Sequence, residues 1–180
     1  MKRLIVLALV LLFVTIGSSQ PSATVVSTQV RVYFSPDGGC TDAIVETIGK
    51  ASSSIWIQAY SFTSAPIAKA LVEAHKRGVN VRVILDKSQK TERYSSAVFL
   101  HNALVPTSID GKHAIAHNKV MVIDGRIVIT GSFNFTKAAE ESNAENLLII
   151  DDAILAGKYA ENWQKHFKHS ETFTGRTSKR

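Results

Sequence analysis

A short segment in the second half of the chain gathers side chains that could act on a phosphate ester. A histidine can act as a nucleophile or carry a proton near neutral pH, and a lysine supplies positive charge. Serine and asparagine supply neutral hydrogen-bond donors, and a glycine lets the backbone approach a tetrahedral oxyanion. The residues of these types are His117, Lys119, Gly131, Ser132 and Asn134, with Asp124 between them. Together they suit the binding and cleavage of a phosphodiester.

Two predicted strands must position these side chains. Residues 114–123 and 126–130 are both rich in apolar side chains, and only Asp124 and Gly125 lie between them. An Asp-Gly pair between two such runs favours a two-residue hairpin turn. Because the turn sets the register of the paired strands, this hairpin would place Ser132 directly opposite His117.

The alternation of side chains along the two strands predicts which of them share a face. The polar face is expected to hold His117, Lys119, Thr130, Ser132 and Asn134. The opposite face is expected to pack into the core with Val120, Val122, Ile127 and Ile129. An imidazole, an ammonium, hydroxyls and a carboxamide would then lie within a few ångströms of each other.

Asp124 stands apart from the other polar residues of the segment. At the turn it would lie about five residues, or roughly 17 Å, from Lys119, too far to touch the same phosphate. We therefore interpret Asp124 as a residue that forms the turn and orders the strands. Its place among the spaced polar residues leaves a catalytic role as the alternative.

The rest of the chain alternates strands and helices at short intervals. Strand patterns cover residues 29–34, 54–60, 79–85 and 146–150, and helix patterns cover residues 41–49, 66–77 and 153–167. Residues 87–104 are polar and partly helical, and residues 170–180 show no core pattern. This alternation predicts the α/β class, as a single-domain α/β/α sandwich with a mixed, largely parallel sheet.

The first 23 residues have the pattern of an export signal. Two basic residues precede an apolar run over residues 4–14, and small and polar residues follow. The run is too short to span a bilayer comfortably. We expect a signal peptide at 1–23 and a domain at 24–180 with its core at about 29–167, located in the periplasm or secreted, without stable membrane association after cleavage. An uncleaved membrane anchor is the alternative.

Composition narrows the classes of site. Cys40 is the only cysteine, which excludes an intramolecular disulfide and a zinc site made of several thiolates. No G-x-x-x-x-G-K or G-x-S-x-G motif is present, so nucleoside-triphosphate and serine-hydrolase chemistry lack support. The net charge of +6 points to polyanionic partners, although two of the 21 basic residues lie in the predicted signal.

Cys40 and the histidines outside this segment are not expected to form a second reactive site. Cys40 is interpreted as a small, semi-buried residue. His113 and His117 would stand about 13 Å apart on a strand, too far to share a metal ion. His166 and His169 end the last predicted helix beside two lysines, and we expect a solvated basic terminus, with a nucleic-acid contact as the alternative.

The spacing H-x-K-x4-D-x6-G-S-x-N resembles the signature of the phospholipase D superfamily and matches it without a gap. A short, exported chain with one copy of this motif is similar to the bacterial Nuc-type endonucleases of that family, over residues 29–167. The resemblance implies metal-independent phosphodiester cleavage through a phosphohistidine intermediate in an α/β/α sandwich, with no metal ion or cofactor. It also places Asp124 in the catalytic motif.

The resemblance implies an acidic partner for the histidine nucleophile. A carboxylate on the second imidazole nitrogen would set the tautomer, and the family pattern assigns this role to Glu145. Glu140 and Glu141 are the competing carboxylates, and we expect them to be solvated charges on a short helix.

The single copy of the motif predicts that two chains pair. Covalent catalysis by histidine needs a nucleophile on one side of phosphorus and a proton donor on the other, because an alkoxide is a poor leaving group. One His117 cannot occupy both positions. We therefore expect a twofold homodimer with a shared active site, in which two Lys119 and two Asn134 side chains bind the nonbridging oxygens.

These observations favour a sequence-nonspecific endonuclease that acts on DNA, with RNA as a further substrate. A positively charged groove would contact the nucleic acid, with Lys87, Lys90, Arg93 and Lys112 as candidate contributors. One alternative is a phosphodiesterase that acts on phospholipid and needs an apolar acyl-binding surface. Another is a noncatalytic, membrane-anchored binder of nucleic acid or lipid.

Overall fold

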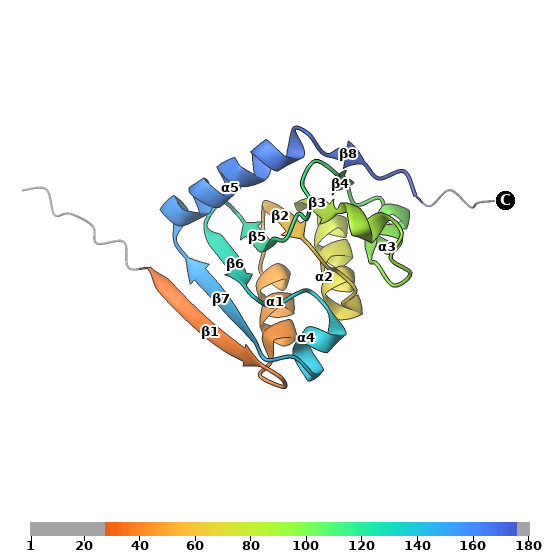
Figure 1. The fold of residues 1–180 in the computed structure, drawn as a ribbon. Coiled ribbons are helices and arrows are strands. Elements are labelled where there is room, and N and C mark those ends of the chain that lie inside the picture. Colours follow the sequence, from red (N-terminus) through yellow and green to blue (C-terminus); the bar gives the residue numbers. More distant parts are fainter. Residues whose placement is uncertain (1–27, 176–180) are drawn as a thin grey trace, which may run out of the picture.

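A single eight-stranded sheet runs through the molecule, with helices on both of its faces (Figure 1). The computed structural model describes residues 28–175, so the predicted signal peptide at 1–23 lies outside the described residues. The strands are β1 (Gln29–Ser35), β2 (Ser54–Ala59), β3 (Asn80–Asp86), β4 (Thr107–Asp110), β5 (Lys119–Ile123), β6 (Ile127–Gly131), β7 (Glu145–Asp151) and β8 (Glu171–Thr172). Their order in the sheet is β1-β7-β6-β5-β2-β3-β4-β8.

Within residues 28–175, five α-helices and one 3-10 helix connect these strands. They are α1 (Cys40–Gly49), α2 (Ala65–Lys76), the 3-10 helix Lys87–Lys90, α3 (Ala97–Asn102), α4 (Lys137–Glu141) and α5 (Ala153–Phe167). Within the described range of the chain, none of the helices has the length and apolar character needed to cross a membrane.

The α/β class, the sandwich and the mixed sheet are confirmed, but the sheet is largely antiparallel. Only the pairs β2–β3 and β3–β4 are parallel, and the other five pairings are antiparallel. Parallel neighbours need a long crossover, which α2 and α3 provide. The β5–β6 hairpin and the short β6–β7 connection reverse the chain instead, so the sequence-based expectation of a largely parallel sheet is wrong.

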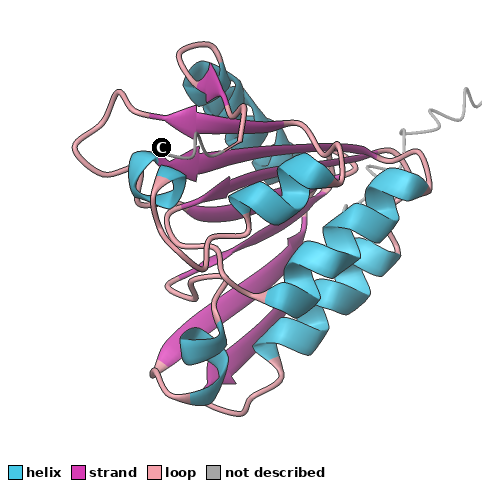
Figure 2. Ribbon diagram, turned by 90° about the vertical axis from the view of Figure 1, so that its right-hand side faces the viewer, coloured by secondary structure: helices cyan, strands magenta, loops and turns pink. Residues whose placement is uncertain are grey.

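The sheet is buried on both faces. Helices α1 and α2 lie side by side against one face, as Figure 2 shows, and cover the larger apolar core. Helix α5 crosses the other face, where Trp163 stacks on Trp56 with ring centroids 5.0 Å apart. The Trp163 indole N–H also donates to the Ile57 carbonyl at 2.8 Å, which fixes α5 against β2. Central strands are therefore apolar on both sides.

The register of the β5–β6 hairpin differs from the prediction by one residue. Ile123 pairs with Ile127, because Arg126 joins the turn and donates its backbone N–H to the Ile123 carbonyl at 3.0 Å. A slip of one residue moves side chains to the other face of a strand. Thr130 therefore lies on the α5 side with Val128, so its predicted place on the polar face is wrong.

The slip also divides the apolar residues that we expected on one face. Val120, Val122 and Val128 pack under α5, whereas Met121, Ile123 and Ile129 pack against the larger core. Both groups are buried, because each face of these strands is covered by helices. The predicted common face of Val120, Val122, Ile127 and Ile129 is thus wrong, although their burial or partial burial agrees with the prediction.

Two strands were not predicted from the sequence. Strand β4 is short and mostly polar, yet all four of its residues are buried beside β3. Strand β8 pairs with β4 and places Phe173 in the core, so residues 170–173 belong to the fold. Conversely, the strand predicted at 114–123 begins only at Lys119, because residues 111–118 form an irregular loop.

Glu140 has a structural role that the sequence analysis did not foresee. Its carboxylate accepts the backbone N–H groups of Gly39 and Thr41, at 3.0 and 2.6 Å. These donors lie at the N-terminus of α1, where a negative charge is favourable. The expectation that Glu140 is a solvated charge is therefore wrong, whereas Glu141 is exposed as expected.

Candidate active site

The candidate site is a polar pocket at one end of three interior strands of the sheet. Lys119 begins β5, Gly131 ends β6 and Glu145 begins β7, so three neighbouring strands meet there. The pocket has a volume of about 350 Å³ and is lined by His117, Lys119, Gly131, Ser132, Asn134 and Glu145. The structure thus brings together all the predicted site residues except Asp124 and Thr130.

His117 and Lys119 form the centre of the pocket. The Lys119 Nζ lies 3.0 Å from Nε2 of His117 and also donates to the His117 carbonyl at 3.3 Å. A protonated lysine can only donate, so Nε2 of His117 accepts and holds a lone pair on the side of the ammonium. A phosphate oxygen bound to Nζ would lie beside the nitrogen that can attack phosphorus.

Burial lowers the pKa of Lys119, and the negative charge of Glu145 acts in the opposite direction. The side chain is only 7% exposed, whereas His117 is exposed. An ammonium removed from water binds a phosphate oxygen more strongly than a solvated one does. The pocket therefore supplies a desolvated positive charge beside an accessible imidazole.

Tyr60 packs against both central residues, and the sequence analysis missed it. Its ring centroid is 4.6 Å from that of His117, and the Lys119 Nζ lies 5.2 Å from the same ring. Tyr60 follows directly after β2, whose last residue, Ala59, pairs with Lys119. The sequence signal was weak, because only the antiparallel β2–β5 pairing brings Tyr60 to this end of the strands.

A tight backbone arrangement holds Ser132. Gly131 has a φ of 146°, and a Cβ there would lie 2.2 Å from the Asn146 carbonyl oxygen. That carbonyl accepts the backbone N–H groups of Ser132 and Phe133, at 3.1 and 3.2 Å. The Ser132 hydroxyl accepts the backbone and side-chain N–H groups of Asn146, at 3.0 and 3.2 Å. Its own proton can therefore be donated to a ligand.

Asn134 carries a buried amide oxygen that has no hydrogen-bond partner among residues 28–175. A buried, unpaired polar atom costs about 1–3 kcal/mol. Such a cost is typical of a site that a substrate or a second chain completes.

Glu145 lines the pocket, but no hydrogen bond joins it to His117 in the described part of the chain. Its Oε1 accepts the Asn143 side-chain N–H at 3.3 Å, and its charge acts on Lys119. The structure thus places Glu145 near the two central residues, while its role as the partner of His117 stays a prediction.

Asp124 lies at the β5–β6 turn, away from the pocket. Its carboxylate accepts backbone N–H groups from Ser52, Ser53 and Ser54 at 2.8–2.9 Å, and both the Ser52 and Ser53 hydroxyls. Burial raises the pKa of Asp124, but these hydrogen bonds outweigh it and hold the pKa well below the usual range. The contacts tie the hairpin to the start of β2, the arrangement that the turn-forming interpretation predicts.

Asp86, which the sequence analysis also missed, fixes the loop that enters β5. This buried carboxylate accepts the backbone N–H of Ala116 at 2.7 Å and that of Ser88 at 2.9 Å. Ala116 immediately precedes His117, so Asp86 fixes the position of the backbone next to the histidine. Burial acts to raise the pKa of Asp86, but the two backbone hydrogen bonds outweigh burial. The net effect is a lowered pKa, so the carboxylate stays charged.

Three of the four predicted groove residues do come together. Lys87, Lys90 and Lys112 line a second pocket beside β4, whereas Arg93 does not line it and lies over the Tyr94 ring. Cys40 is fully buried in the core, and burial raises the pKa of its thiol to about 11. This burial is more complete than the semi-buried position that we expected, and it makes the thiol unreactive.

The pocket contains a nucleophile and phosphate-binding groups of the kind that phosphoryl transfer by covalent catalysis uses. An imidazole nitrogen accepts a hydrogen bond from a desolvated ammonium, and a hydroxyl and an amide line the same pocket. Positioning and charge stabilisation are the main contributions a protein makes to this reaction.

Comparisons with known proteins show that the chain is similar to phospholipase D-like proteins. A family model described as "Cardiolipin synthase, PLD-like domain" matches residues 44–170. A protein named Phospholipase D from Rickettsia conorii is 47% identical over 135 residues, which cover 75% of this chain and 68% of that protein.

Two solved structures share the fold over their full length. Nuc from Salmonella typhimurium, described as a phospholipase D family member, is 38% identical, with a TM-score of 0.79 and 84% of this chain covered. NucT from Helicobacter pylori is 27% identical, with a TM-score of 0.75 and 82% covered. Both structures are covered completely.

Proposed function

Because the chain belongs to the phospholipase D superfamily of phosphodiesterases, we propose that it is a metal-independent, sequence-nonspecific endonuclease. Its substrate is DNA, with RNA as a further candidate. The observation that carries this proposal is the convergence of His117, Lys119, Ser132 and Asn134 in one polar pocket. The likeness to Nuc and NucT, together with the motif spacing, supports a nuclease over other members of the superfamily.

The reaction proceeds in two displacements at phosphorus. In the first, Nε2 of His117 attacks phosphorus and forms a P–N bond, and the departing alkoxide takes a proton from a second histidine. In the second, that histidine accepts a proton from water, the hydroxide attacks phosphorus, and the P–N bond breaks. Lys119 and Asn134 bind the nonbridging oxygens throughout.

The second histidine is His117 of another copy of the chain. His117 is the one histidine that lines the pocket in the described part of the chain. The unpartnered amide oxygen of Asn134 supports a site that one chain leaves incomplete. We infer that two chains face each other across a twofold axis and share one active site.

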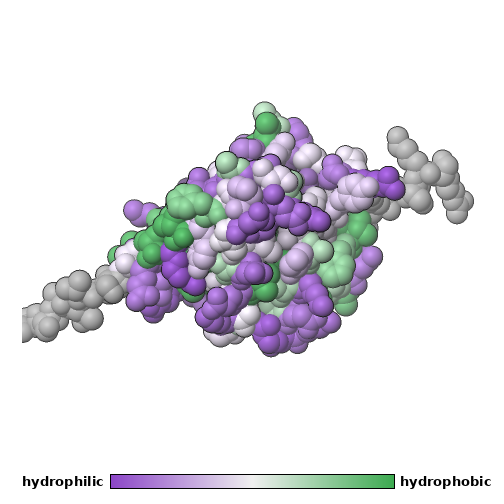
Figure 3. All heavy atoms as spheres, turned by 90° about the horizontal axis from the view of Figure 1, so that it is seen from below, coloured by the Kyte–Doolittle hydropathy of each residue, from purple (hydrophilic) through white to green (hydrophobic). Residues whose placement is uncertain are grey.

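The surface around the site is mostly polar. Strand β7 starts at the lower end of the sheet in Figure 1, and the view from below in Figure 3 shows many hydrophilic residues, with hydrophobic patches toward both sides. A polar surface suits a nucleic acid.

With removal of a signal peptide at 1–23, the enzyme acts in the periplasm or outside the cell and has no stable membrane association.

A phospholipid is the second candidate substrate. Val30, Val32 and Phe34 alternate along the edge strand β1 and are all at least 49% exposed, which would suit acyl chains. Phe34 pairs with Asn146, next to Glu145 of the pocket. The name of the Rickettsia relative also supports this substrate class.

The test compares both substrates in excess EDTA. Purified protein lacking residues 1–23 is incubated with plasmid DNA and, separately, with phosphatidylcholine vesicles, beside a His117→Ala variant. We expect nicked and linear DNA, intact lipid, and no reaction with the variant. Intact DNA with hydrolysed lipid would overturn the nuclease, and a loss of both activities in EDTA at an unchanged Tm would overturn the metal-independent reaction.

A further inference from the structure

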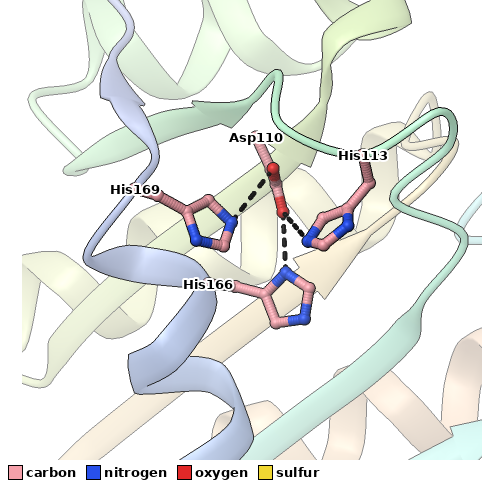
Figure 4. A group of neighbouring side chains, drawn as sticks. All are labelled: Asp110, His113, His166 and His169. Carbon is pink, nitrogen blue, oxygen red and sulfur yellow. Dashed lines mark hydrogen bonds and ion pairs between the residues drawn. The ribbon is translucent and has the colours of Figure 1, made fainter.

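Three histidines surround a buried carboxylate outside the active-site pocket (Figure 4). Asp110 ends β4 and is fully buried, and His113 follows it in the loop before β5. His166 lies near the end of α5, and His169 comes just after it. Half of the six histidines in the chain therefore meet at one carboxylate. The expectation that His166 and His169 form a solvated basic terminus is wrong, because both side chains point inward.

The imidazole nitrogens point at the carboxylate from three directions. Nδ1 of His166 lies 2.7 Å from Oδ2 of Asp110, and Nε2 of His169 lies 3.2 Å from Oδ1. Nε2 of His113 lies 3.8 Å from Oδ2. The four atoms that could act as ligands all lie within 4.8 Å of one another.

These separations are close to those around a tetrahedral metal ion. With bonds of about 2.1 Å to zinc, ligand atoms would lie about 3.4 Å apart, and imidazole centroids about 5 Å apart. The three ring centroids are 4.9, 5.3 and 5.4 Å apart. The four ligand atoms are therefore close enough together to surround a single ion.

Of the three histidines, His166 is the one whose ring nitrogen lies at a short hydrogen-bond distance from Asp110, 2.7 Å. Nε2 of His169 is buried and makes no hydrogen bond to any residue of the described range, although Oδ1 of Asp110 is near. Nε2 of His113 is too far from the carboxylate for a hydrogen bond. A cation among the four groups would pair with both nitrogens and with the carboxylate.

We propose that Asp110, His113, His166 and His169 bind one zinc ion. Imidazole nitrogens and a carboxylate oxygen are ligands that zinc prefers, and four protein ligands complete a tetrahedral shell. Such a closed shell leaves no position for a substrate, so the ion is structural. Zinc replaces the protons that the ligating nitrogens carry, and the backbone N–H of Lys112 orients Asp110 from outside the shell, at 3.1 Å.

The ion would fasten three parts of the fold together. It joins the end of β4, the loop 111–118 and the end of α5, and this loop leads directly to His117. The same loop is held by Lys87, whose Nζ donates to the His113 carbonyl at 3.0 Å. His169 and Lys112 also line the lysine-rich pocket, so zinc would hold that surface in place.

The test uses zinc and cobalt with the untagged protein lacking residues 1–23, after a chelator has been used and removed. We expect one zinc ion per chain by elemental analysis and tight binding by calorimetry. Cobalt bound in its place should give the intense visible absorption of tetrahedral coordination. Zinc at about 100 times its Kd should raise Tm by roughly 5–10 °C.

Two matched variants locate the ion. His166→Gln removes one ligand and should weaken zinc binding by about 100-fold or more. His75→Gln changes a histidine in the last turn of α2, outside the cluster, and should bind zinc as the unchanged protein does. Because the wild-type Tm shift needs no variant, the test stands even if His166→Gln folds poorly.

Three outcomes would overturn the proposal. They are no zinc binding at 100 µM metal (an order-of-magnitude ceiling for a structural site), equal zinc binding by both variants, and zinc binding that His117→Ala abolishes. None of these measurements uses the phosphodiesterase reaction. A chain that binds zinc but cleaves no DNA would therefore overturn only the proposed function.

Discussion

The contact between Lys119 and His117 explains how one small pocket can prepare a nucleophile. The ammonium keeps the lone pair of Nε2 directed into the pocket, and a phosphate that binds Nζ takes its place beside that lone pair. Gly131 and Asn146 then hold Ser132 in reach of the same phosphate. Each of these contacts depends on a single atom, so a change of one side chain should be visible in the kinetics.

Asp124 gives the first prediction, because its place in the motif and its place in the structure suggest different roles. Asp124→Asn should lower the free energy of unfolding by about 2 kcal/mol at pH 7, through weaker hydrogen bonds at a partly solvated site. The value of kcat should change less than threefold, by about the scatter of a surface substitution. Urea unfolding and steady-state DNA cleavage measure the two effects, and a 100-fold loss of kcat with unchanged stability would assign Asp124 to catalysis.

The same residue predicts a dependence of stability on pH. The folded-state pKa of Asp124 is lowered, so its stabilising effect is complete above the unfolded pKa of about 3.9. The effect is lost as the pH falls below that value towards the lower folded pKa. The difference in stability between the protein and Asp124→Asn should therefore shrink in acid. A difference that grows below pH 4 in urea titrations would contradict this account.

The helices and strands show why some of the site could be predicted and some could not. The spacing of apolar residues gave β1, β2, β3, β7 and helices α1, α2 and α5 almost to their ends. The motif residues then fell at one end of these interior strands, because β5, β6 and β7 are neighbours.

The errors arose where a single residue or a long-range contact decides the structure. Arg126 joins the hairpin turn and shifts the register, which no pattern of alternating residues reveals. Asp86, Tyr60 and Asp110 each contact a partner that is 30 or more residues away in the chain. The pairing β2–β5 and the docking of α5 create these contacts, so they follow from the assembled fold.

Asp86 supplies a prediction about the loop that enters β5. Asp86→Ala removes the acceptor for the Ala116 N–H and frees the residue before His117. We expect kcat for DNA cleavage to fall about 10–100-fold, because misplacement of a nucleophile by 1 Å can cost about 100-fold, while KM changes less than threefold. Asp124→Asn serves as the control that loses stability alone. A purely structural role would lower Tm in both variants and leave kcat of both intact.

A basic surface lies beside the active site and is formed by Lys87, Lys90 and Lys112. If this surface contacts phosphates, binding releases counterions from the DNA. The affinity for DNA then falls as the salt concentration rises. Lys112→Ala should reduce the slope of log K against log salt by about one unit, with the same effect on unrelated sequences. Fluorescence anisotropy with His117→Ala, which binds without cleaving, measures the slope. An unchanged slope would remove Lys112 from the interface.

At the scale of the whole molecule, we propose that two chains build one active site with two histidines. Among residues 28–175, the pocket holds one imidazole and one ammonium, and the amide oxygen of Asn134 has no hydrogen-bond partner. A twofold partner would supply the proton donor that the first displacement needs. Exchange of subunits between active and inactive chains tests this arrangement directly.

Wild-type protein and His117→Ala are unfolded together, refolded in different ratios at constant total concentration, and assayed on plasmid DNA. If both histidines are needed, only dimers with two wild-type chains cleave. Activity should then follow the square of the wild-type fraction and fall to about one quarter in an equal mixture. A parallel mixture with His75→Ala should lose nothing. A linear fall, to about one half in the equal mixture, would contradict a shared two-histidine site.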